Sequence, residues 1–301
     1  MSDTKFFAAF IMTYERSSVL KDTIIKVFSQ TLPPEMILIV DNSETLTTLQ
    51  LIESMADSRI KYHRVGYNAG PAGAAKIGLQ LLAEDGYQWI YWGDDDNPPD
   101  FPDTFEKLLG LIATVPNVGI ASAVGQYFSK HSGNIVRVPD FVLKSNSSVM
   151  VDSIAGGMTM LVNAEVVRSG VLPDAHLFFG FEELDFCIKT KKIGFNLVAS
   201  TDLFLRSREK FNRLNFQRPF YMRKSVRDLH RQYYSVRNLI VILKRNRLIW
   251  ALIYQITKTL GKSIYGFRYG FNYGKLNLKH SFKGLGHGLF GYRSPFLEVV
   301  K

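Results

Sequence analysis

Short runs of apolar residues recur along the first third of this chain, and each run ends in polar or glycine-rich residues. Four of these runs cover residues 5–12, 36–40, 60–65 and 89–92. Uninterrupted apolar runs of this length are typical of parallel strands that are buried on both faces. Between them, apolar residues recur at helical spacing and are bounded by capping or helix-breaking residues. This alternation predicts an α/β fold with a mostly parallel sheet and flanking helices.

The pattern continues beyond residue 100 with less regular spacing. We expect a helix over 103–113, a strand over 118–124, a mobile loop or hairpin over 125–150, a strand over 154–162, and an amphipathic helix that opens at 178 and ends near Gly194. The last strand begins at Gly156-Gly157, which indicates either a tight turn or close approach of the backbone to a substrate. Glu182 and Asp185 are three residues apart and share a face of the expected helix, whereas Glu183 points about 100° away.

Polar or glycine residues follow four successive strands of the expected sheet. They are Thr13, Asp41, Gly70 and the triplet Asp94–Asp96. Each residue alone is more typical of an ordinary loop. Carboxyl ends of parallel strands meet at one edge of a sheet, and open α/β sheets bind ligands just outside that edge. Four such exits in register therefore predict a shared nucleotide site.

The acidic triplet lies between the apolar run Trp89–Trp92 and the helix-breaking pair Pro98-Pro99. Three adjacent carboxylates repel one another, so a fold that gathers them at a strand end needs a counter-charge. Mg²⁺ and Mn²⁺ prefer oxygen ligands, and Mg²⁺ commonly takes one or two carboxylates together with substrate phosphates. The triplet is either a solvated acidic turn or part of a cation site, and its flanking elements favour the cation site.

Composition limits the class of protein. The chain has 301 residues, of which 46% are hydrophobic and 21% are charged, so one large domain, with or without an appendage, can bury a core. A single cysteine, Cys187, excludes a disulfide within the chain and favours a reducing compartment. The N-terminus lacks a basic stretch followed by a long apolar core, so we expect no signal peptide.

Charge divides the chain into two parts. Residues 204–301 contain 21 Lys and Arg but only three Asp and Glu, whereas residues 1–203 carry a net charge of −8. Within the basic part, Lys244–Arg247 interrupts an apolar stretch, which rules against a helix that spans a membrane. Basic residues interleaved with Trp, Tyr and Leu fit helices that lie on an anionic membrane surface, and a helical appendage packed on the main domain fits equally well. Nucleic acid fits less well, because no recognisable binding module is present.

With these residues placed, residues 5–210 resemble the family-2 glycosyltransferases, which have the GT-A fold and use nucleotide sugars. Two nucleotide-contacting loops of the family are similar to Met12–Arg16 and Val40–Ser43. The Asn-x-Gly-x-x-Gly segment of the rhamnosyl- and galactofuranosyltransferase branch is similar to Tyr67–Gly73. The metal-binding Asp-x-Asp motif is similar to Gly93–Asp96, and the acceptor-side acidic motif is similar to Phe181–Asp185. The segments Tyr233–Asn238 and Gly284–Gly291 are also similar to that branch. The resemblance implies a GT-A domain over residues 1–210 and a basic, helical, membrane-associating region over residues 211–301.

The resemblance also implies roles for individual residues. Asp96 would bind the metal, Asp94 would contact the ribose or the donor sugar, and Asp95 would be a further donor-binding residue. Glu183 takes the position of the catalytic base, and Glu182 and Asp185 are the other acceptor-side candidates, together with Gly157. The remaining donor-binding residues would be Thr13, Glu15, Arg16, Asp41, Asn68 and Gly70.

The chain departs from the family pattern at two places. The family more often has aspartate where Glu183 stands, and a glutamate reaches about one methylene further. Many members also have a metal-binding histidine shortly after the following strand, where this chain has Arg206 and Arg208. Either the metal is held by Asp96, diphosphate and water, or Arg206 and Arg208 contact the diphosphate directly.

The implied activity is that of an inverting, metal-dependent glycosyltransferase that uses Mn²⁺ or Mg²⁺. It would move a sugar, rhamnose or galactofuranose in that branch, from a UDP- or dTDP-linked donor to a lipid-linked glycan during synthesis of cell-surface polysaccharide. It would work in the cytoplasm, at the inner face of the cell membrane. Two other classes remain open, namely a nucleotidyltransferase and a non-catalytic protein that binds nucleotides or glycans. A nucleotidyltransferase would favour a Gly- and Lys/Arg-rich signature after the first strand, which Thr13–Arg16 does not provide.

Overall fold

A sheet of eight strands forms the centre of the computed structural model, which describes residues 6–216 and 223–291. Residues 1–5, which belong to the segment considered for a signal peptide, lie outside the described residues. The strand order is β3-β2-β1-β4-β9-β5-β10-β8. The strands are β1 Phe7–Thr13, β2 Ile37–Asp41, β3 Ile60–Arg64, β4 Trp89–Asp94, β5 Val118–Ser122, β8 Ser148–Met150, β9 Met160–Asn163 and β10 Asn196–Ser200.

The first four strands are parallel neighbours, as their apolar runs predicted. Thr13 pairs in register with Asp41, and Met12 pairs with Asp94, so the carboxyl ends of β1, β2 and β4 meet at one edge. Beyond β4, strand β9 runs antiparallel to both of its neighbours, and β10 is parallel to β5. The prediction of an α/β fold with a mostly parallel sheet is therefore confirmed.

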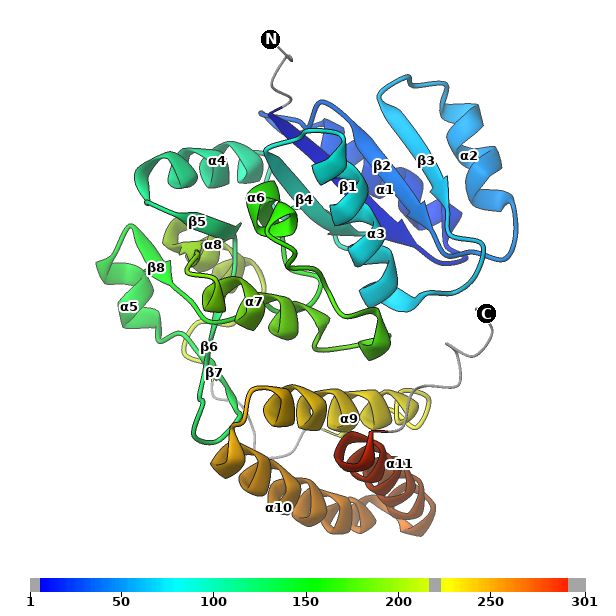
Figure 1. The fold of residues 1–301 in the computed structure, drawn as a ribbon, viewed down its shortest axis with the longest axis vertical. Helices are drawn as coiled ribbons and strands as arrows, with labels where there is room; N and C mark the ends of the chain where they lie inside the picture. Colours follow the sequence, from blue (N-terminus) through cyan, green and yellow to red (C-terminus); the bar gives the residue numbers. More distant parts are fainter. Residues whose placement is uncertain (1–5, 217–222, 292–301) are drawn as a thin grey trace.

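Helices cover both faces of the sheet (Figure 1). The helices of this part are α1 Ser17–Phe28, α2 Thr47–Met55, α3 Gly70–Glu84, α4 Thr104–Thr114, α6 Ala164–Arg168, α7 Glu182–Lys192 and α8 Thr201–Lys210. Alternate residues of β1 point to opposite faces: Phe10 packs with α3 and α7, whereas Ile11 packs with α1 and α4. Both faces of the central strands are thus apolar and buried, which explains why their sequences read as continuous apolar runs.

The predicted strand over residues 154–162 is wrong in its first half. Only Met160–Asn163 forms β9, and the residues before it form a turn. Gly157 has a φ of +73°, in the left-handed region that glycine tolerates, and the side-chain amide of Asn97 donates a hydrogen bond to its carbonyl. These contacts bend the backbone over the end of β4 instead of extending it along the sheet.

The segment over residues 125–150 contains the expected hairpin, formed by β6 Gln126–Phe128 and β7 Ile135–Arg137. A short helix, α5 Asp140–Ser145, follows and leads into β8. The hairpin reaches from the sheet toward the C-terminal helices (Figure 1).

Three C-terminal helices form a layer below the α/β part (Figure 1). They are α9 His230–Arg245, α10 Ile249–Tyr265 and α11 Phe271–Phe290; the break between α9 and α10 follows Lys244 and Arg245, within the charged interruption of the apolar pattern. Ile242 and Leu243 of α9 share a buried cluster with Leu177 and Leu184, so α9 packs directly on the α/β part. Across residues 6–216 and 223–291, none of the helices combines the length and the apolar content that crossing a membrane requires.

Candidate active site

A pocket of about 690 Å³ opens at the carboxyl edge of the sheet. Asp94, Asp96 and Asn97 border it at the end of β4, and Glu182 and Glu183 border it at the start of α7. The turn over residues 153–157 forms another part of its wall. The pocket therefore brings together the acidic triplet and the acidic helix start, which are about ninety residues apart in the sequence.

The glycine pair lies close to both groups of carboxylates. A Cβ atom on Gly156 would be 2.9 Å from Oε1 of Glu183, and a Cβ atom on Gly157 would be 3.3 Å from Oδ2 of Asp94. A side chain at either position would crowd the carboxylate beside it. The structure confirms the tight turn and places the backbone of the pair at the wall of the pocket, whereas its close approach to a substrate stays a prediction.

Burial dominates the electrostatics of these carboxylates. It raises the pKa of Glu183 to about 7. Burial, together with the negative charges of Glu183, Asp96 and Asp95, raises the pKa of Asp94 to about 7. Burial and the neighbouring Glu183 also raise the pKa of Glu182 well above its usual range. Shifts of this kind are common at functional sites, because they mark charge that solvent and protein leave uncompensated.

The three carboxylates of the triplet have different surroundings. Asp95 is buried, accepts a hydrogen bond of 2.7 Å from the hydroxyl of Thr13, and forms an ion pair with Arg16. Asp96 borders the pocket and pairs with the same guanidinium at 2.6 Å. Asp94 borders the pocket and has no such cation among the ion pairs of the described residues. Arg16 thus supplies part of the counter-charge that the triplet needs, and the predicted donor contact from Asp95 gains no support from its internal contacts.

The other predicted donor-binding residues lie along the same edge of the sheet. Asp41 is fully buried and accepts hydrogen bonds of 2.8 Å from the backbone N–H of Ser43 and from the hydroxyl of Tyr62. Burial and the hydrogen bond to Asp41 raise the pKa of Tyr62. Glu15 is exposed and accepts hydrogen bonds from the backbone and the hydroxyl of Thr45.

The loop after β3 closes this edge. Asn68 accepts a hydrogen bond of 3.0 Å from the backbone N–H of Gly70, which starts α3 with a φ of +68°. A Cβ atom on Gly70 would lie 2.4 Å from the carbonyl oxygen of Phe178, so only glycine allows the two segments to approach this closely. The donor-side loop therefore contacts the segment that leads into α7.

Asp185 lies apart from Glu182 and Glu183. It does not border the pocket, and it forms ion pairs of 2.5 Å with Lys189 and of 3.2 Å with Arg245. Both cations therefore lie beside a carboxylate that is buried. Of the two alternative acceptor-side carboxylates, Glu182 therefore faces the pocket and Asp185 faces α9.

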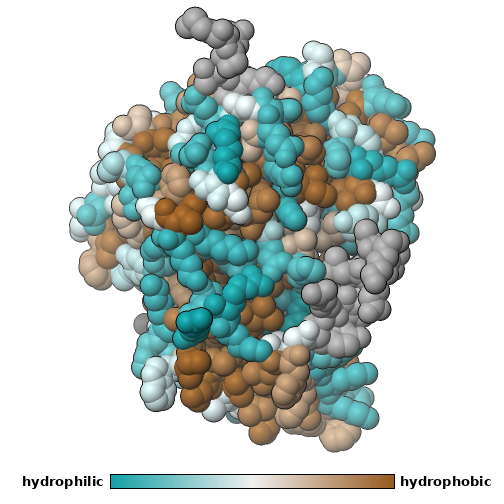
Figure 2. Space-filling model, in the orientation of Figure 1, coloured by the Kyte–Doolittle hydropathy of each residue, from teal (hydrophilic) through white to brown (hydrophobic). Residues whose placement is uncertain are grey.

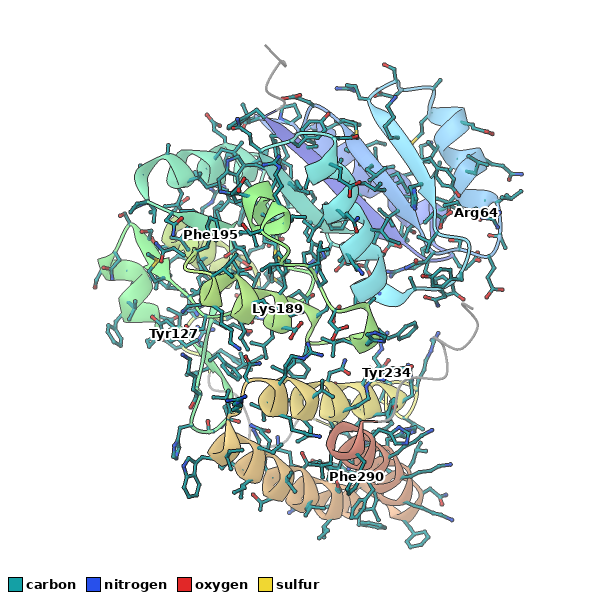
Figure 3. The ribbon with its side chains drawn as sticks, viewed as in Figure 1. Arg64, Tyr127, Lys189, Phe195, Tyr234 and Phe290 are labelled. Atoms are coloured by element: carbon teal, nitrogen blue, oxygen red, sulfur yellow. The ribbon has the colours of Figure 1, made fainter. Side chains whose placement is uncertain are left out.

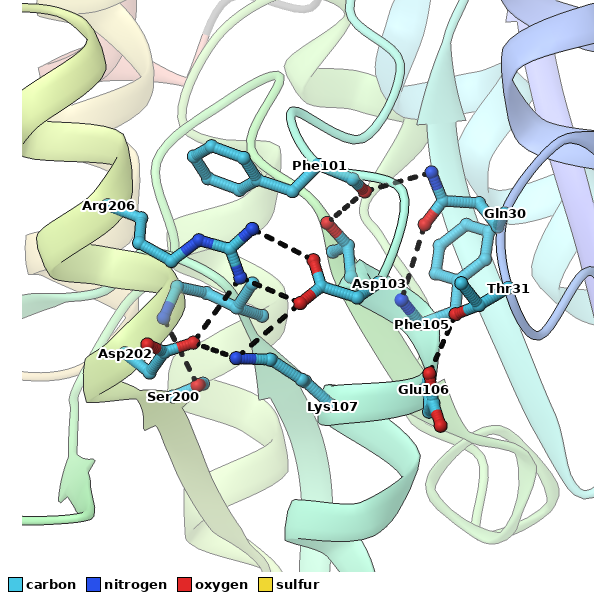
Figure 4. Close-up of polar contacts among 12 residues, drawn as sticks. Gln30, Thr31, Phe101, Asp103, Phe105, Glu106, Lys107, Ser200, Asp202 and Arg206 are labelled. Atoms are coloured by element: carbon cyan, nitrogen blue, oxygen red, sulfur yellow. Dashed lines mark hydrogen bonds and ion pairs between the residues drawn. The ribbon is translucent and has the colours of Figure 1, made fainter.

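Arg206 and Arg208 also have partners outside the pocket. Arg206 donates hydrogen bonds of 2.8 and 3.0 Å to Asp103 and pairs with Asp202 (Figure 4). Arg208 is buried, donates a hydrogen bond of 2.7 Å to the carbonyl of Val138 and pairs with Asp140. Neither arginine borders the pocket. The prediction that they contact a diphosphate gains no support from this geometry, and the alternative in which Asp96 would bind the metal stays a prediction.

The donor set of the pocket suits a cation that is bound together with phosphate. In the described part of the chain, no group of three or more His, Cys, Asp and Glu residues is arranged to hold a metal ion. Asp94 and Asp96 nevertheless present two carboxylates to one pocket, and Mg²⁺ commonly uses one or two carboxylates beside substrate phosphates. The raised pKa of Asp94 fits this donor set, because a nearby cation would stabilise its ionised form.

Sequence reasoning missed several residues that border the pocket. Asn97 immediately follows the triplet and could have been included by proximity alone. Gln126 and Ile135 come from the hairpin, Phe179 precedes α7, and Ser235 comes from α9 in the basic C-terminal part. No periodicity or motif marked Ser235 as a neighbour of the triplet, because its position depends on how α9 packs on the α/β part.

Comparison with known proteins is consistent with this geometry. Residues 8–148 match the family model described as "Glycosyl transferase family 2". Galactofuranosyltransferase GlfT1 of Mycolicibacterium smegmatis is 23% identical over 199 residues, which cover 62% of this chain and 65% of that protein. The match therefore spans somewhat less than two thirds of that relative.

Two solved structures share the fold. The mannosyltransferase PcManGT from Pyrobaculum calidifontis, in complex with GDP-Man and Mn²⁺, has a TM-score of 0.55 at 13% identity; the match covers 95% of this chain and 88% of that one. GalNAc-T7, with UDP, GalNAc and Mn²⁺, has a TM-score of 0.57 at 14% identity and covers all of this chain and 57% of that one.

Proposed function

We infer that the protein transfers a sugar from a nucleoside diphosphate to an acceptor hydroxyl, because residues 8–148 match the family-2 glycosyltransferase model and the chain has the GT-A fold. The observation that carries this proposal is the pocket in which Asp94 and Asp96 share one cavity with the buried Glu183. The two sides have different tasks in such a transfer. One side holds the diphosphate, and the other takes a proton from the attacking hydroxyl.

The chemistry assigned to each side follows from the properties of its residues. A sugar hydroxyl is a weak nucleophile, and a positioned carboxylate that removes its proton during attack contributes typically about 10²–10⁴-fold. A pKa near 7 suits Glu183 for this role, because it can accept a proton at neutral pH and release it afterwards. A single displacement by the hydroxyl inverts the anomeric carbon and releases the nucleoside diphosphate. When bound, Mn²⁺ or Mg²⁺ would neutralise the charge that develops on the diphosphate.

The donor half would hold the nucleoside along the carboxyl edge of the sheet. Asp41, Thr13, Glu15 and Arg16 lie there, and Asn68 and Gly70 close the edge beside α3. For the donor we propose UDP-galactofuranose or dTDP-rhamnose, on the resemblance of the Tyr67–Gly73 segment and on the 23% identity with a galactofuranosyltransferase. For the acceptor we propose a lipid-linked glycan in the synthesis of cell-surface polysaccharide.

A panel of nucleotide sugars tests this activity. We expect the purified full chain to release nucleoside diphosphate from one of these donors in the presence of Mn²⁺ or Mg²⁺, and to show a matching rise in melting temperature. Chelation of the metal with EDTA should return the release to background, because the charged side chains that border the pocket are all carboxylates and would repel a diphosphate without a cation. If a nucleotide sugar raises the melting temperature but is never cleaved, the protein is a nucleotide-binding protein without this activity.

For the C-terminal helices we propose contact with the anionic inner surface of the cell membrane. Large apolar side chains are exposed on α10 and α11, among them Trp250 at 71%, Phe271 at 72% and Phe290 at 89%. Figure 2 shows apolar residues gathered over the lower end of the molecule, where these helices lie. The basic residues of the same region would attract anionic lipid, and aromatic residues beside them favour the interface between headgroups and acyl chains.

Binding to vesicles tests this membrane contact. We expect the full chain to bind vesicles that contain anionic lipid at low salt, and Trp250→Ser to weaken partitioning about tenfold, since burying a large apolar side chain contributes about 1.5–3 kcal/mol. Phe141→Ser is the matched control, because Phe141 is 70% exposed but lies on α5 in the α/β part. Equal binding by the wild type and the Trp250 variant would exclude α10 from the contact.

A further inference from the structure

Helix α9 holds the segment that leads into the acidic helix α7. The side chain of Asn238 is completely buried, and its amide lies within hydrogen-bonding distance of three backbone carbonyls. These carbonyls belong to Leu177 at 2.9 Å, Phe179 at 3.0 Å and Gly180 at 2.7 Å. A single side chain of the C-terminal part thus contacts the backbone just before Glu182 and Glu183.

The segment that Asn238 contacts has an unusual backbone conformation. Phe178 and Phe181 have φ values of 60° and 69°, and Gly180 between them has a φ of 81°. Non-glycine residues are strained in this region, and they persist there only where surrounding contacts fix them. Phe181 directly precedes α7 as its N-cap residue, so its conformation sets the direction in which the first turn of α7 leaves. That first turn carries Glu183.

Other residues of α9 reinforce the contact from both sides. Arg237 donates a hydrogen bond of 2.8 Å to the side-chain oxygen of Asn238, which orients the amide toward the carbonyls, and another of 2.7 Å to the carbonyl of Leu177. The ring of Tyr234 packs against that of Phe178, with centroids 5.5 Å apart. Figure 3 shows Tyr234 on α9, the helix that lies directly below α7.

The far end of α9 contacts the same region. Arg245 pairs with Asp174 at 2.6 Å and with Asp185 at 3.2 Å, so it joins the segment before η1 (Ala175–Leu177) to the first turn of α7. By contrast, no hydrogen bond among the described residues joins Asn238 to Asp41, Asp94 or Asp96. The hydrogen bonds of Asn238 therefore go to the segment before α7, and the donor-side loop meets that segment through Phe178, beside Gly70 and Ala72.

We propose that Asn238 is a positioning residue that, through the strained backbone of residues 178–181, holds the Glu183 carboxylate where it faces Asp94 across the pocket. This proposal rests on the transferase activity proposed above, in which Glu183 receives the proton of the acceptor hydroxyl. The C-terminal region is then a structural part of the acceptor half, in addition to any contact with membrane. Disrupting this contact should slow proton transfer more than it weakens donor binding.

The variant Asn238→Asp tests the proposal, because aspartate has the same shape but lacks the donating amide. We expect its turnover number to fall about 10- to 100-fold, since small displacements of a catalytic group have effects of this size. The dissociation constant for donor with Mn²⁺ should change much less than the turnover number, because no hydrogen bond among the described residues joins Asn238 to the donor-side carboxylates. Hydrogen exchange of the backbone amides over residues 178–185 should become faster.

Asn277→Asp is the matched control. Asn277 is also buried in the C-terminal helices, but its amide reaches only the carbonyl of Lys262, at 3.4 Å. This variant should keep the wild-type exchange over residues 178–185 and most of the turnover. If both variants lose turnover equally, the effect comes from general loosening of the helical layer and the proposal is wrong.

A second variant covers the case in which Asn238→Asp does not fold. Arg245→Met removes the ion pairs to Asp174 and Asp185 from a side chain that is 41% exposed. We expect a smaller loss of turnover with unchanged donor binding. Full turnover in a variant whose residues 178–185 exchange faster would overturn the positioning role, even though the transferase activity stands. If the wild type cleaves no nucleotide sugar, the proposed function itself fails. The hydrogen-exchange rates would still show whether Asn238 fixes the backbone of residues 178–185.

Discussion

The Glu183→Gln variant is expected to transfer sugar about 10²–10⁴-fold more slowly than the wild type, while it binds donor and metal normally. Glutamine has nearly the same shape as glutamate, and the buried position of residue 183 would be filled in the same way. The amide cannot accept the proton of the attacking hydroxyl. The loss should therefore appear in the turnover number and leave the donor dissociation constant unchanged.

Steady-state transfer assays, together with calorimetry on the nucleoside diphosphate and Mn²⁺, measure these two quantities. Glu182→Gln is the control, because Glu182 is the adjacent buried carboxylate and borders the same pocket. A loss that is larger for Glu182→Gln than for Glu183→Gln would transfer the role of base to Glu182. Near-normal turnover of Glu183→Gln would show that Glu183 is not the catalytic base.

The second large effect is expected for Asp96→Asn. Removing this carboxylate should weaken metal-dependent donor binding and lower kcat/KM by roughly 10²–10³-fold, because electrostatic stabilisation at the leaving group is typically of this size. Asp96 borders the pocket, and among the described residues its one ion pair is with Arg16, whose side chain is half exposed. The fold should therefore tolerate the change.

Titration of Mn²⁺ in the presence of donor checks this expectation. Asp95→Asn provides the contrast, since Asp95 is buried against Thr13 and Arg16 and does not border the pocket. That variant should lower the melting temperature. Its affinity for Mn²⁺ should stay close to that of the wild type. The assignment of the cation to Asp96 would be wrong if Asp96→Asn kept the wild-type Mn²⁺ dependence.

The core of the fold could be predicted because its signal is local. The runs that become β1, β2 and β4 are continuous and apolar, and parallel pairing follows from the helices between them. The convergence of Thr13, Asp41 and Asp94 follows from the same rule. The resemblance already gave Asp94 and Asp96 the main roles, but the sequence could not show that Asp95 and Asp96 share Arg16, which lies eighty residues before Asp96.

The parts that could not be predicted depend on contacts between distant segments. The strand expected over residues 154–162 fails at Gly157, whose carbonyl is bound by Asn97 from another loop. Asp185 shares a helix face with Glu182, but Arg245 of α9 holds it away from the pocket. Helical periodicity places side chains around one axis and says nothing about the partner that another helix brings to them.

Two glycines of α11 set the spacing of the helix that carries Asn238. A Cβ atom on Gly284 would lie 2.8 Å from the carbonyl oxygen of Tyr233, and one on Gly288 would lie 2.8 Å from the Cβ of Ile240. Both lie against the side of α9 that is turned away from Asn238. We therefore expect substitutions of Gly284 and Gly288 to be poorly tolerated, although neither residue borders the pocket. A single methyl group added at either position would push α11 and α9 apart.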